Sequence, residues 1–477
     1  MNGIYKKKPA VANLGIMLFY NALEAQECTC TQIEWVPPYK QSDEIDGMLD
    51  KYLYGEAGGN GIEKKIEEAN RQAAACLTDN NPVWVDIQPA GECVEGLEDH
   101  MILHSGPPID LDDRVMLHQR GMVSAMLFEG WAKDEKEAVE ILRSGEIKID
   151  SALNHNTVGA GTGIITKSVA MIVTEDKRNG TTAATFPAEG PFQGGFCGWG
   201  LYSPEIAENL RYMREELFPP MREMLAKGGG IPTKPILAEA MQMGDENHTR
   251  QTAADLLFDK IVLPRLFELD LPKEQIMRTV RYIVDTPRFF HCYGQGASRA
   301  AAIAADGIEY STMVTAMAGN GVEYGIKIAA LPGQWFTAKA PMMEGRYTST
   351  KYTRKDQLPW LGDSCVVECA GMGGTAAAAS PIVCNLRGMS LQDSINQTRE
   401  MEKICITHNP NYVIPNLDFD CLPSGIDIRL VLKTGVLPAI HGGMFNYQGG
   451  LIGAGMARVP MECFQKAMKA FAAKYRG

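Results

Sequence analysis

Residues 82–90 read PVWVDIQPA and residues 101–109 read MILHSGPPI. Each is an apolar run that ends in Pro or Gly, and helix-like stretches precede them at 43–53 and 61–77. Strands that alternate with helices predict a parallel sheet with crossover helices. Ligands on such sheets bind beyond the carboxyl ends of the strands, so QPA and LHSGPP are expected on a functional edge.

The 477-residue chain is too long for one hydrophobic core, so we expect a multidomain α/β fold. Residues 1–110 predict an N-terminal α/β domain with a parallel-type sheet, and residues 111–202 a mixed α/β segment with a glycine-rich loop. Residues 203–305 carry almost only helical patterns and predict an all-helical domain. Residues 306–477 predict a C-terminal α/β domain.

Local signals mark three element boundaries. KDEKEAVEILRSG predicts a helix that ends at Gly145, a residue suited to a helix C-terminus. Asn320-Gly321 between two strand-like runs predicts a hairpin. A last helix is expected over residues 460–475, with Pro at its start.

Composition excludes several classes of function. The net charge of −12 argues against nucleic acid as a partner, because phosphate backbones require a basic surface. The 12 cysteines are scattered without a disulfide or zinc spacing, which favours a reducing compartment. No apolar run approaches the length of a membrane span, and no apolar core follows the basic start. We therefore expect a cytoplasmic protein without a membrane segment.

Common catalytic signatures are missing from the sequence. It contains no G-x-x-x-x-G-K-[ST] phosphate loop and no H-E-x-x-H zinc helix. Its G-x-G-x-G at residues 159–163 differs from the dinucleotide fingerprint G-x-G-x-x-G. The Ser-Thr-Arg and His-Pro motifs of ordinary carbamoyltransferases are also absent. We expect neither a bound cofactor nor a metal.

A first candidate segment is the glycine-rich loop NHNTVGAGTG. Closely spaced glycines let a backbone approach an anion and direct N–H groups toward it. The candidate anion-binding residues are Asn156, Gly159, Gly161 and Gly163, and His155 is a candidate catalytic residue. The alternative is a tight structural loop with a capping asparagine.

A second candidate segment is MGDENHTR at residues 243–250, before a long helical pattern. Asp245 would cap that helix and Glu246 suits its positive first turn, which leaves His248 and Arg250 without a structural role. The four side chains are candidates for binding a substrate, relaying a proton or, although their spacing matches no known metal site, binding a metal for an amidohydrolase reaction. The alternative is an ion-paired joint between domains.

Two further segments combine glycine with charge. Asp363 and Glu368 precede Gly373 and Gly374, and the glycine loop resembles a helix N-terminus open to an anion. Tight packing explains the same pattern equally well.

The other segment is GIDIR, in which Asp427 and Arg429 share a face if the segment is a strand. A salt-bridged structural pair is the favoured reading, and anion binding is the alternative. Among single histidines, His104 and His441 are weaker candidates, whereas His291 is read as ordinary.

Taken together, these segments resemble one family, the YlbE/AllG-like proteins that are encoded beside FdrA. The resemblance runs in order over most of the chain and rests on nine blocks: LHSGPPI, LFEGWAKDE, HNTVGAGTGIIT, MGDENHTR, GNGVEYGI, GQWFTA, LGDS-x-x-x-E, SGIDIRLVLKTGVLP and IGAG-x-x-x-VP.

The resemblance implies a subunit of oxamate carbamoyltransferase in anaerobic allantoin and purine degradation. The implied reaction is phosphorolysis of oxalurate to oxamate and carbamoyl phosphate. The implied partners are an FdrA-like subunit and a further small subunit in a heteromeric complex. Such chemistry requires fixed donors for a developing negative charge and an acid or base, roles open to His155, Asp245, Glu246 and His248. Arg250 would hold the substrate carboxylate.

Two departures from the family pattern affect the expected substrate. Gln251 stands where the family pattern has Asn, and His441-Gly442-Gly443 replaces a small polar segment. Another ureido compound is therefore an alternative substrate. A second alternative is a non-catalytic partner subunit, with the chemistry on the FdrA-like protein, whose fold resembles acyl-CoA synthetases.

We expect the dispersed motifs to share one cleft, with His248 and Arg250 approaching the glycine loop at 159–163. We also expect an oligomer, because GPFQGGFCGWGLY at residues 190–202 is aromatic, glycine-rich and uncharged, as interface segments often are. A buried loop is the alternative for that stretch.

Overall fold

The computed structural model describes residues 10–14, 16–33, 39–55, 61–190 and 195–475. It divides into two compact units, residues 1–40 and 41–477. Within the first unit, β1 (Ala10–Leu14) and β2 (Thr29–Ile33) pair in parallel and are joined by α1 (Met17–Glu24). This βαβ unit agrees with the alternation read from the first residues of the sequence.

The stretch PVWVDIQPA forms β3 (Pro82–Pro89) in a five-stranded sheet of the second unit. It pairs antiparallel with β7 (Ala170–Asp176) on one side and with β9 (Ile231–Pro232) on the other. The parallel pairing expected for this strand is wrong, because its neighbours come from the later segments and not through the preceding helices. The sheet is completed by β8 (Thr181–Thr185) and β6 (Thr157–Val158).

The parallel arrangement occurs one strand further along the chain. β4 (Met101–His104) pairs in parallel with β5 (Lys148–Ser151), and the helices α5 (Met116–Glu129) and α6 (Glu135–Ser144) form the crossover. Asp134 caps the start of α6, and Gly145 ends it in the left-handed conformation as predicted.

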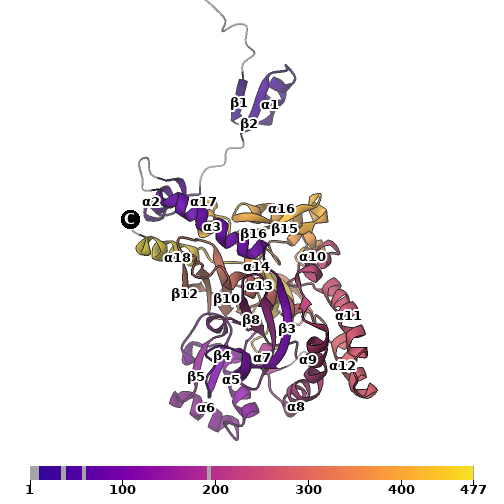
Figure 1. The fold of residues 1–477 in the computed structure, drawn as a ribbon. Helices are drawn as coiled ribbons and strands as arrows, with labels where there is room; N and C mark the ends of the chain where they lie inside the picture. The colour runs from indigo at the N-terminus through magenta and orange to yellow at the C-terminus, as the bar shows by residue number, and fades with distance from the viewer. Residues whose placement is uncertain (1–9, 15, 34–38, 56–60, 191–194, 476–477) are drawn as a thin grey trace, which may run out of the picture. The chain divides into compact units, whose positions relative to one another are not determined.

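Residues 203–305 are predominantly helical, as predicted, and the two-residue β9 lies among the helices. Ser203 caps the first helix, and proline occupies its first turn. The last helix, α13, is almost entirely buried and packs on β7 and β8 (Figure 1). The helical elements are α8 (Pro204–Tyr212), η5 (Met213–Leu217), α9 (Phe218–Gly228), α10 (Lys234–Gln242), α11 (Thr252–Phe267), α12 (Lys273–Asp285) and α13 (His291–Ile303).

The C-terminal segment contains three antiparallel sheets and begins with the predicted hairpin, in which Gly321 has a positive φ. The first sheet comprises β12 (Leu331–Lys339), β11 (Glu323–Ile328), β10 (Val314–Asn320) and β14 (Leu361–Gly362). The second comprises β13 (Glu344–Tyr347), β18 (Leu451–Arg458) and β17 (Ala439–Phe445), and the third β15 (Cys405–Ile414) and β16 (Asp420–Ile426). The helices are α14 (Val366–Cys369), α15 (Pro381–Asn385), α16 (Leu391–Glu402), α17 (Ile428–Thr434) and α18 (Met461–Lys474).

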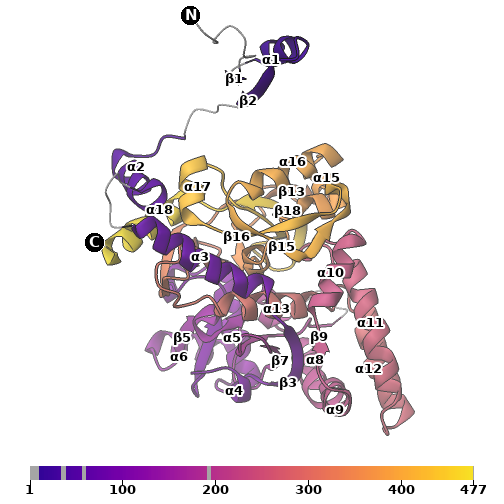
Figure 2. The same cartoon turned by 45° about the horizontal axis from the view of Figure 1, so that its top comes forward.

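Two early helical elements complete the C-terminal core. α2 (Asp43–Leu49) contacts α17 and α18, and α3 (Ile62–Thr78) lies along β15 and β16 (Figure 2). Their apolar side chains join the same buried cluster as Phe464 and Phe471. The multidomain α/β fold is confirmed, and the boundaries proposed at residues 110, 202 and 305 stay a prediction.

Candidate functional site

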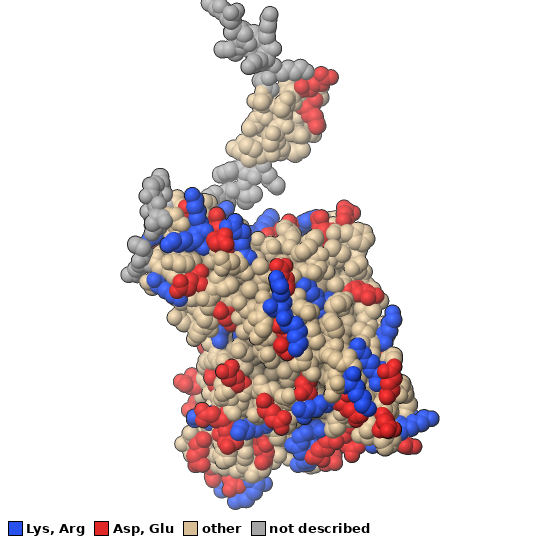
Figure 3. All heavy atoms as spheres, in the orientation of Figure 1, with Lys and Arg blue, Asp and Glu red and all other residues tan. Residues whose placement is uncertain are grey.

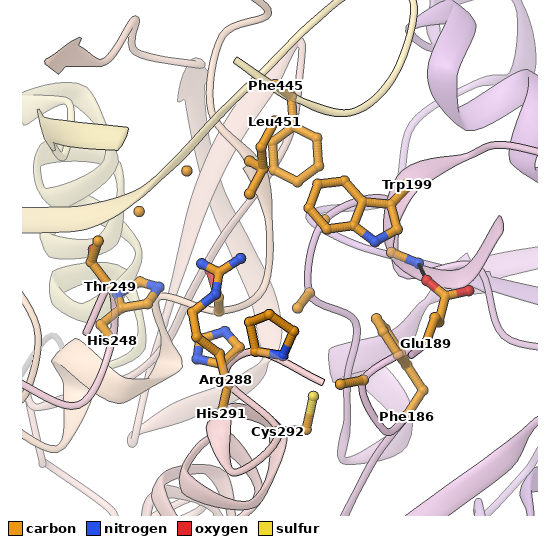
Figure 4. Close-up of a pocket in the computed structure, with 18 of the residues that line it drawn as sticks. Phe186, Glu189, Trp199, His248, Thr249, Arg288, His291, Cys292, Phe445 and Leu451 are labelled. Atoms are coloured by element: carbon orange, nitrogen blue, oxygen red, sulfur yellow. Dashed lines mark hydrogen bonds between the residues drawn. The ribbon is translucent and has the colours of Figure 1, made fainter. Parts of the chain in front are cut away.

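A cavity of about 960 Å³, including its open mouth, lies where six separate parts of the chain converge. It is lined by residues of the glycine loop, of the segment after β8, of the MGDENHTR loop, of the start of α13 and of the β17–β18 hairpin, and by Ser364 after β14. Figure 4 shows the aromatic rings of Trp199 and Phe445 on one side of the cavity and His248 on the other. Such a concave site with few polar groups is typical of small-molecule binding.

A histidine–glutamate pair forms one wall of the cavity. Nδ1 of His248 lies 2.7 Å from Oε1 of Glu368, and both side chains are buried. The same oxygen accepts hydrogen bonds from the backbone N–H groups of Gly374 and His441, both at 3.1 Å. Because this oxygen already accepts from two N–H groups, Nδ1 of His248 is the donor in the contact, and Nε2 is directed away from Glu368.

A second buried histidine–glutamate pair lies behind the first. Nδ1 of His441 is 3.6 Å from Oε1 of Glu246. Burial alone would lower the pKa of His441, but Cys384 and Glu246 outweigh it and raise that pKa to about 9. Burial would raise the pKa of Glu246, yet His441 and the backbone N–H of Thr249 hold it below its ordinary value. Each partner of this pair thus shifts the pKa of the other toward the charged form.

The start of α13 supplies an imidazole and a guanidinium. His291 stacks on His248 with ring centroids 6.0 Å apart, and burial lowers its pKa well below the ordinary value. Gln251 donates to its Nδ1 at 2.8 Å. Arg288 lines the same cavity, and its guanidinium makes no hydrogen bond or ion pair with any residue that the structure describes.

The wall opposite His248 contains a buried acid. The carboxylate of Glu189 accepts from the backbone N–H groups of Gly198 at 2.9 Å and Cys197 at 3.1 Å. It thereby fixes α7 (Phe196–Trp199), which carries the Trp199 ring of the cavity (Figure 4). Burial raises the pKa of Glu189 to about 7, despite the two N–H donors.

The glycines of the 159–163 loop are explained mainly by packing. A Cβ at Gly161 would lie 2.0 Å from the carbonyl oxygen of Gly198, and one at Gly163 would lie 2.8 Å from the backbone nitrogen of Ser105. A Cβ at Gly159 would lie 2.6 Å from Cα of Gly163. Gly161 nevertheless lines the cavity, so the loop brings one backbone wall to the site.

Asp363 joins this loop to the rest of the fold. Its carboxylate accepts from the N–H groups of Gly159 at 2.9 Å and Gly106 at 2.7 Å. Burial raises its pKa to about 7. Asp363 is enclosed by these contacts, whereas its neighbour Ser364 lines the cavity.

His155 and Asn156 are bound elsewhere. His155 contacts the carbonyl of Glu95 and the carboxylate of Asp150, which raises its pKa. Asn156 accepts from the buried guanidinium of Arg299 at 3.2 Å. Neither is among the described residues that line the cavity.

Asp245 and Arg250 neutralise each other. The Arg250 guanidinium donates to Oδ1 of Asp245, and Oδ2 accepts from the first N–H groups of α11, those of Ala253 at 2.7 Å and Ala254 at 2.9 Å. Asp245 therefore caps α11 from the preceding loop, whereas the N-cap position expected for it is held by Gln251, and Glu246 lies outside the first turn. Arg250 is the ion-pair partner of Asp245.

The remaining predicted residues divide into two groups. Gly373 and Gly374 wrap around Glu368, and a Cβ at Gly373 would lie 2.0 Å from Oε1 of that carboxylate. Asp427 and Arg429 form a buried ion pair at 2.7 Å that caps α17 and binds the carbonyl of Tyr52. This matches the structural reading favoured for that pair.

Sequence reasoning missed Glu189, Arg288 and the ligand-facing position of His291. No motif surrounds these residues, and TPRFFHCYG at residues 286–294 reads as a plain helix start. Residues 191–194 of the proposed interface stretch lie outside the described residues.

Acidic and basic side chains are intermixed over the face shown in Figure 3. Among the described helices, none is long and apolar enough to cross a membrane. No group of three or more His, Cys, Asp or Glu within the described ranges is arranged to hold a metal ion. The absence of a metal or cofactor stays a prediction.

Comparison with known proteins identifies the family of this chain. The chain belongs to the AllG family, whose model, described as oxamate carbamoyltransferase subunit AllG, matches residues 147–364. The family expected from the sequence blocks is thus confirmed.

Particular relatives define how close the similarity is. The AllG subunit of Escherichia coli K12 is 32% identical over 85% of this chain and 98% of its own length. The uncharacterized protein YahG of the same organism is 33% identical over 98% of this chain and 97% of its own. A crystal structure of a conserved protein of unknown function from Enterococcus faecalis V583 superposes with a TM-score of 0.83. That protein is 31% identical, and the match covers 86% of this chain and 99% of the other. The AllG relative is named a subunit, so that protein works within an assembly.

Proposed function

We propose that this chain is the subunit of a carbamoyltransferase complex that carries the reaction site for oxalurate and oxamate. The observation that carries the proposal is the Glu368–His248 pair, whose imidazole opens on the cavity. The names of the family model and of the E. coli AllG subunit support the choice of reaction. The pathway would be anaerobic allantoin degradation, and the partners would be an FdrA-like and a further small subunit.

The reaction needs one bond broken and one formed. A phosphate oxygen attacks the ureido carbon of oxalurate, the bond from that carbon to the amide nitrogen breaks, and carbamoyl phosphate and oxamate result. The leaving nitrogen must gain a proton, and the attacking phosphate must lose one if it arrives protonated. A histidine with a free Nε2 suits this exchange, because it accepts a proton from one group and returns it to the other.

Glu368 would orient His248 and stabilise it when it is charged. A buried carboxylate that binds Nδ1 fixes both the tautomer and the direction of the ring, as in other catalytic pairs and triads. Gly373 and Gly374 hold that carboxylate from behind. Glu189, with its pKa of about 7, faces the cavity from the opposite wall and would supply a second titratable group near neutral pH.

The decisive experiment uses the complex reconstituted with its FdrA-like and small subunits. We expect His248→Ala to reduce phosphate-dependent carbamoyl transfer by at least about a hundredfold while assembly is retained. His408→Ala is the matched control, since His408 pairs with Glu402 on the surface. Unchanged turnover in His248→Ala would assign the chemistry to another subunit and leave this chain as a non-catalytic partner.

A different ureido acid is the second candidate substrate. Both departures from the family pattern lie at or next to the cavity. Gln251 binds the cavity residue His291, and Gly442 and Gly443 line the wall. A panel of ureido acids, assayed for phosphate-dependent carbamoyl phosphate formation by the same complex, distinguishes the two. A higher kcat/KM for another acid than for oxalurate would reassign the substrate.

A further inference from the structure

One cation of the cavity has no hydrogen-bonded or ion-paired partner among the residues that the structure describes. The guanidinium of Arg288 points into the cavity between His248 and Trp199 (Figure 4). Within the described residues it forms no hydrogen bond and no ion pair, unlike Arg250, Arg299 and Arg429. Because arginine stays charged in proteins, this is a positive charge directed at a space that a ligand can fill.

The backbone holds this side chain in place at some energetic cost. Arg288 has a φ of +59°, a region that side chains other than glycine rarely adopt. Asp255 in the first turn of α11 stabilises it by accepting from the N–H groups of Arg288 at 3.0 Å and Phe290 at 2.9 Å. Strained residues that the surrounding structure fixes occur preferentially at binding sites.

The surroundings favour an anion over a neutral ligand. Burial lowers the pKa of Arg288, which reports the loss of water around its charge. Its neighbour His291 is uncharged at neutral pH, because burial holds the imidazole pKa well below its ordinary value. Arg288 is half-buried, and the nearby carboxylate of Asp255 favours its charged form without forming an ion pair with the guanidinium. An incoming carboxylate would offset the remaining loss of hydration.

We propose that Arg288 binds the carboxylate of the substrate and selects small planar acids with an adjacent amide, the oxamate group. This inference rests on the proposed function and assigns to Arg288 the role that the sequence suggested for Arg250. The fork of a guanidinium binds both oxygens of a carboxylate. The flat rings of Trp199 and Phe445, 5.6 Å apart, form a wall of the same cavity and suit a planar ligand.

The test compares two ligands that differ in one group. Oxamate and oxamide have the same shape, but oxamide carries a neutral amide in place of the carboxylate. In calorimetric titrations of the full chain, Arg288→Met should weaken oxamate binding by about tenfold to a hundredfold. Oxamide binding should be unchanged, and Arg288→Lys should give an intermediate loss for oxamate.

Arg278→Met is the matched control, because Arg278 pairs with Glu216 on the surface. Its oxamate affinity should equal that of the wild type. Undiminished oxamate binding in Arg288→Met, or an equal loss of oxamide, would overturn the assignment. A loss of affinity confined to inorganic phosphate would also overturn the assignment, since Arg288 would then bind the other substrate. Thermal unfolding of each variant shows whether a loss of affinity for both ligands is caused by misfolding. If Arg288→Met is misfolded, the oxamate and oxamide affinities of Arg288→Lys are compared instead.

Turnover separates this inference from the proposed function. In the reconstituted complex, the inference predicts that Arg288→Met raises KM for oxalurate more than it lowers kcat. A wild-type complex without carbamoyl transfer would reject the function, while oxamate titration of the single chain would still decide the role of Arg288. Unchanged KM in Arg288→Met with activity lost in His248→Ala would reject the inference alone.

Discussion

The loops before α11 and before α13 each present an arginine near the same cavity, but they use it differently. Arg250 in the first loop is tied to Asp245, which also caps the helix. In the second loop an acid likewise holds the backbone, since Asp255 binds the N–H of Arg288, yet the guanidinium is left without a partner in the described chain.

The difference shows when a charged sequence motif indicates a ligand-binding site. MGDENHTR is dense in charge, and most of that charge is neutralised within the motif or by the nearest helix N-terminus. TPRFF carries one charge, that of Arg288, which pairs with none of the residues that the structure describes. A cluster of opposite charges is therefore weak support for ligand binding, because the cluster can satisfy itself, whereas a single buried charge needs an external partner.

The largest expected effect concerns the paired loop. Asp245→Ala removes the acceptor for two backbone N–H groups and for Arg250, so the free energy of unfolding should fall by about 4 kcal/mol. Urea denaturation measures the change. Asp134→Ala is the control, because Asp134 is an exposed cap with one such bond and should lose about 1 kcal/mol. Equal losses in the two variants would contradict the dual role of Asp245.

The acid of the cavity should make stability depend on pH. The pKa of Glu189 is raised to about 7, so the folded state retains a proton that the unfolded chain releases above its ordinary pKa. The stabilisation is complete below about pH 4.5 and is lost as the pH rises through 7, in total roughly 3 kcal/mol. Glu189→Gln should remove this contribution to the pH dependence of the free energy of unfolding, measured by denaturation from pH 5 to 8. A slope identical to that of the wild type would show that Glu189 is not buried as a carboxyl group.

A third prediction disturbs the His248 pair without touching either partner. Gly373 has a φ of +58°, and a Cβ there would lie 2.0 Å from Glu368 Oε1. Gly373→Ala should therefore lower kcat of the reconstituted complex by about a hundredfold. Gly388→Ala is the matched control: it has a φ of +73°, and no atom lies within 4 Å of the added carbon. Similar kcat values for the two variants would mean that backbone strain, and not the Glu368 contact, sets the effect.

The smallest effect tests the comparison directly. Arg250→Met leaves Asp245 bound to the helix N–H groups, and the Arg250 side chain is about one-third exposed, at 32%. We expect a loss of about 1 kcal/mol in stability. Oxamate affinity, by calorimetry, should stay within about twofold of the wild type, in contrast to the loss predicted for Arg288→Met. A larger loss of affinity in Arg250→Met than in Arg288→Met would reverse the roles given to the two loops.

Much of the fold follows from local sequence signals. The hairpin at Asn320-Gly321 and the end of α6 at Gly145 each depend on a few adjacent residues, and both are present. Asp245 binds the N–H groups of α11 from farther away than an N-cap residue, because the helix begins only at Thr252. The pairing of β3 does not follow from such signals. An apolar strand carries no mark of direction, and its partners β7 and β9 lie far along the chain.

The site was only partly predictable for the same reason. His248 was singled out because its motif leaves it without a structural role, and Glu368 because of the glycines after it. Their contact spans 120 positions, which spacing within a motif cannot indicate. Arg288 and Glu189 stand in unremarkable segments, and only the tertiary fold brings them to the cavity. The glycine loop has the opposite property, because its conspicuous pattern is explained largely by close backbone packing.

The residues that form the cavity walls lie far apart in the sequence, and this has a consequence for synthesis of the protein. Gly161 and Leu451 line the same space, so the nascent chain has no complete cavity until almost the whole polypeptide has left the ribosome. Contacts this distant in sequence form late and slowly in folding. Prematurely ended chains would lack the β17–β18 wall whatever else they fold, so ligand-dependent protection from proteolysis should belong to finished molecules alone.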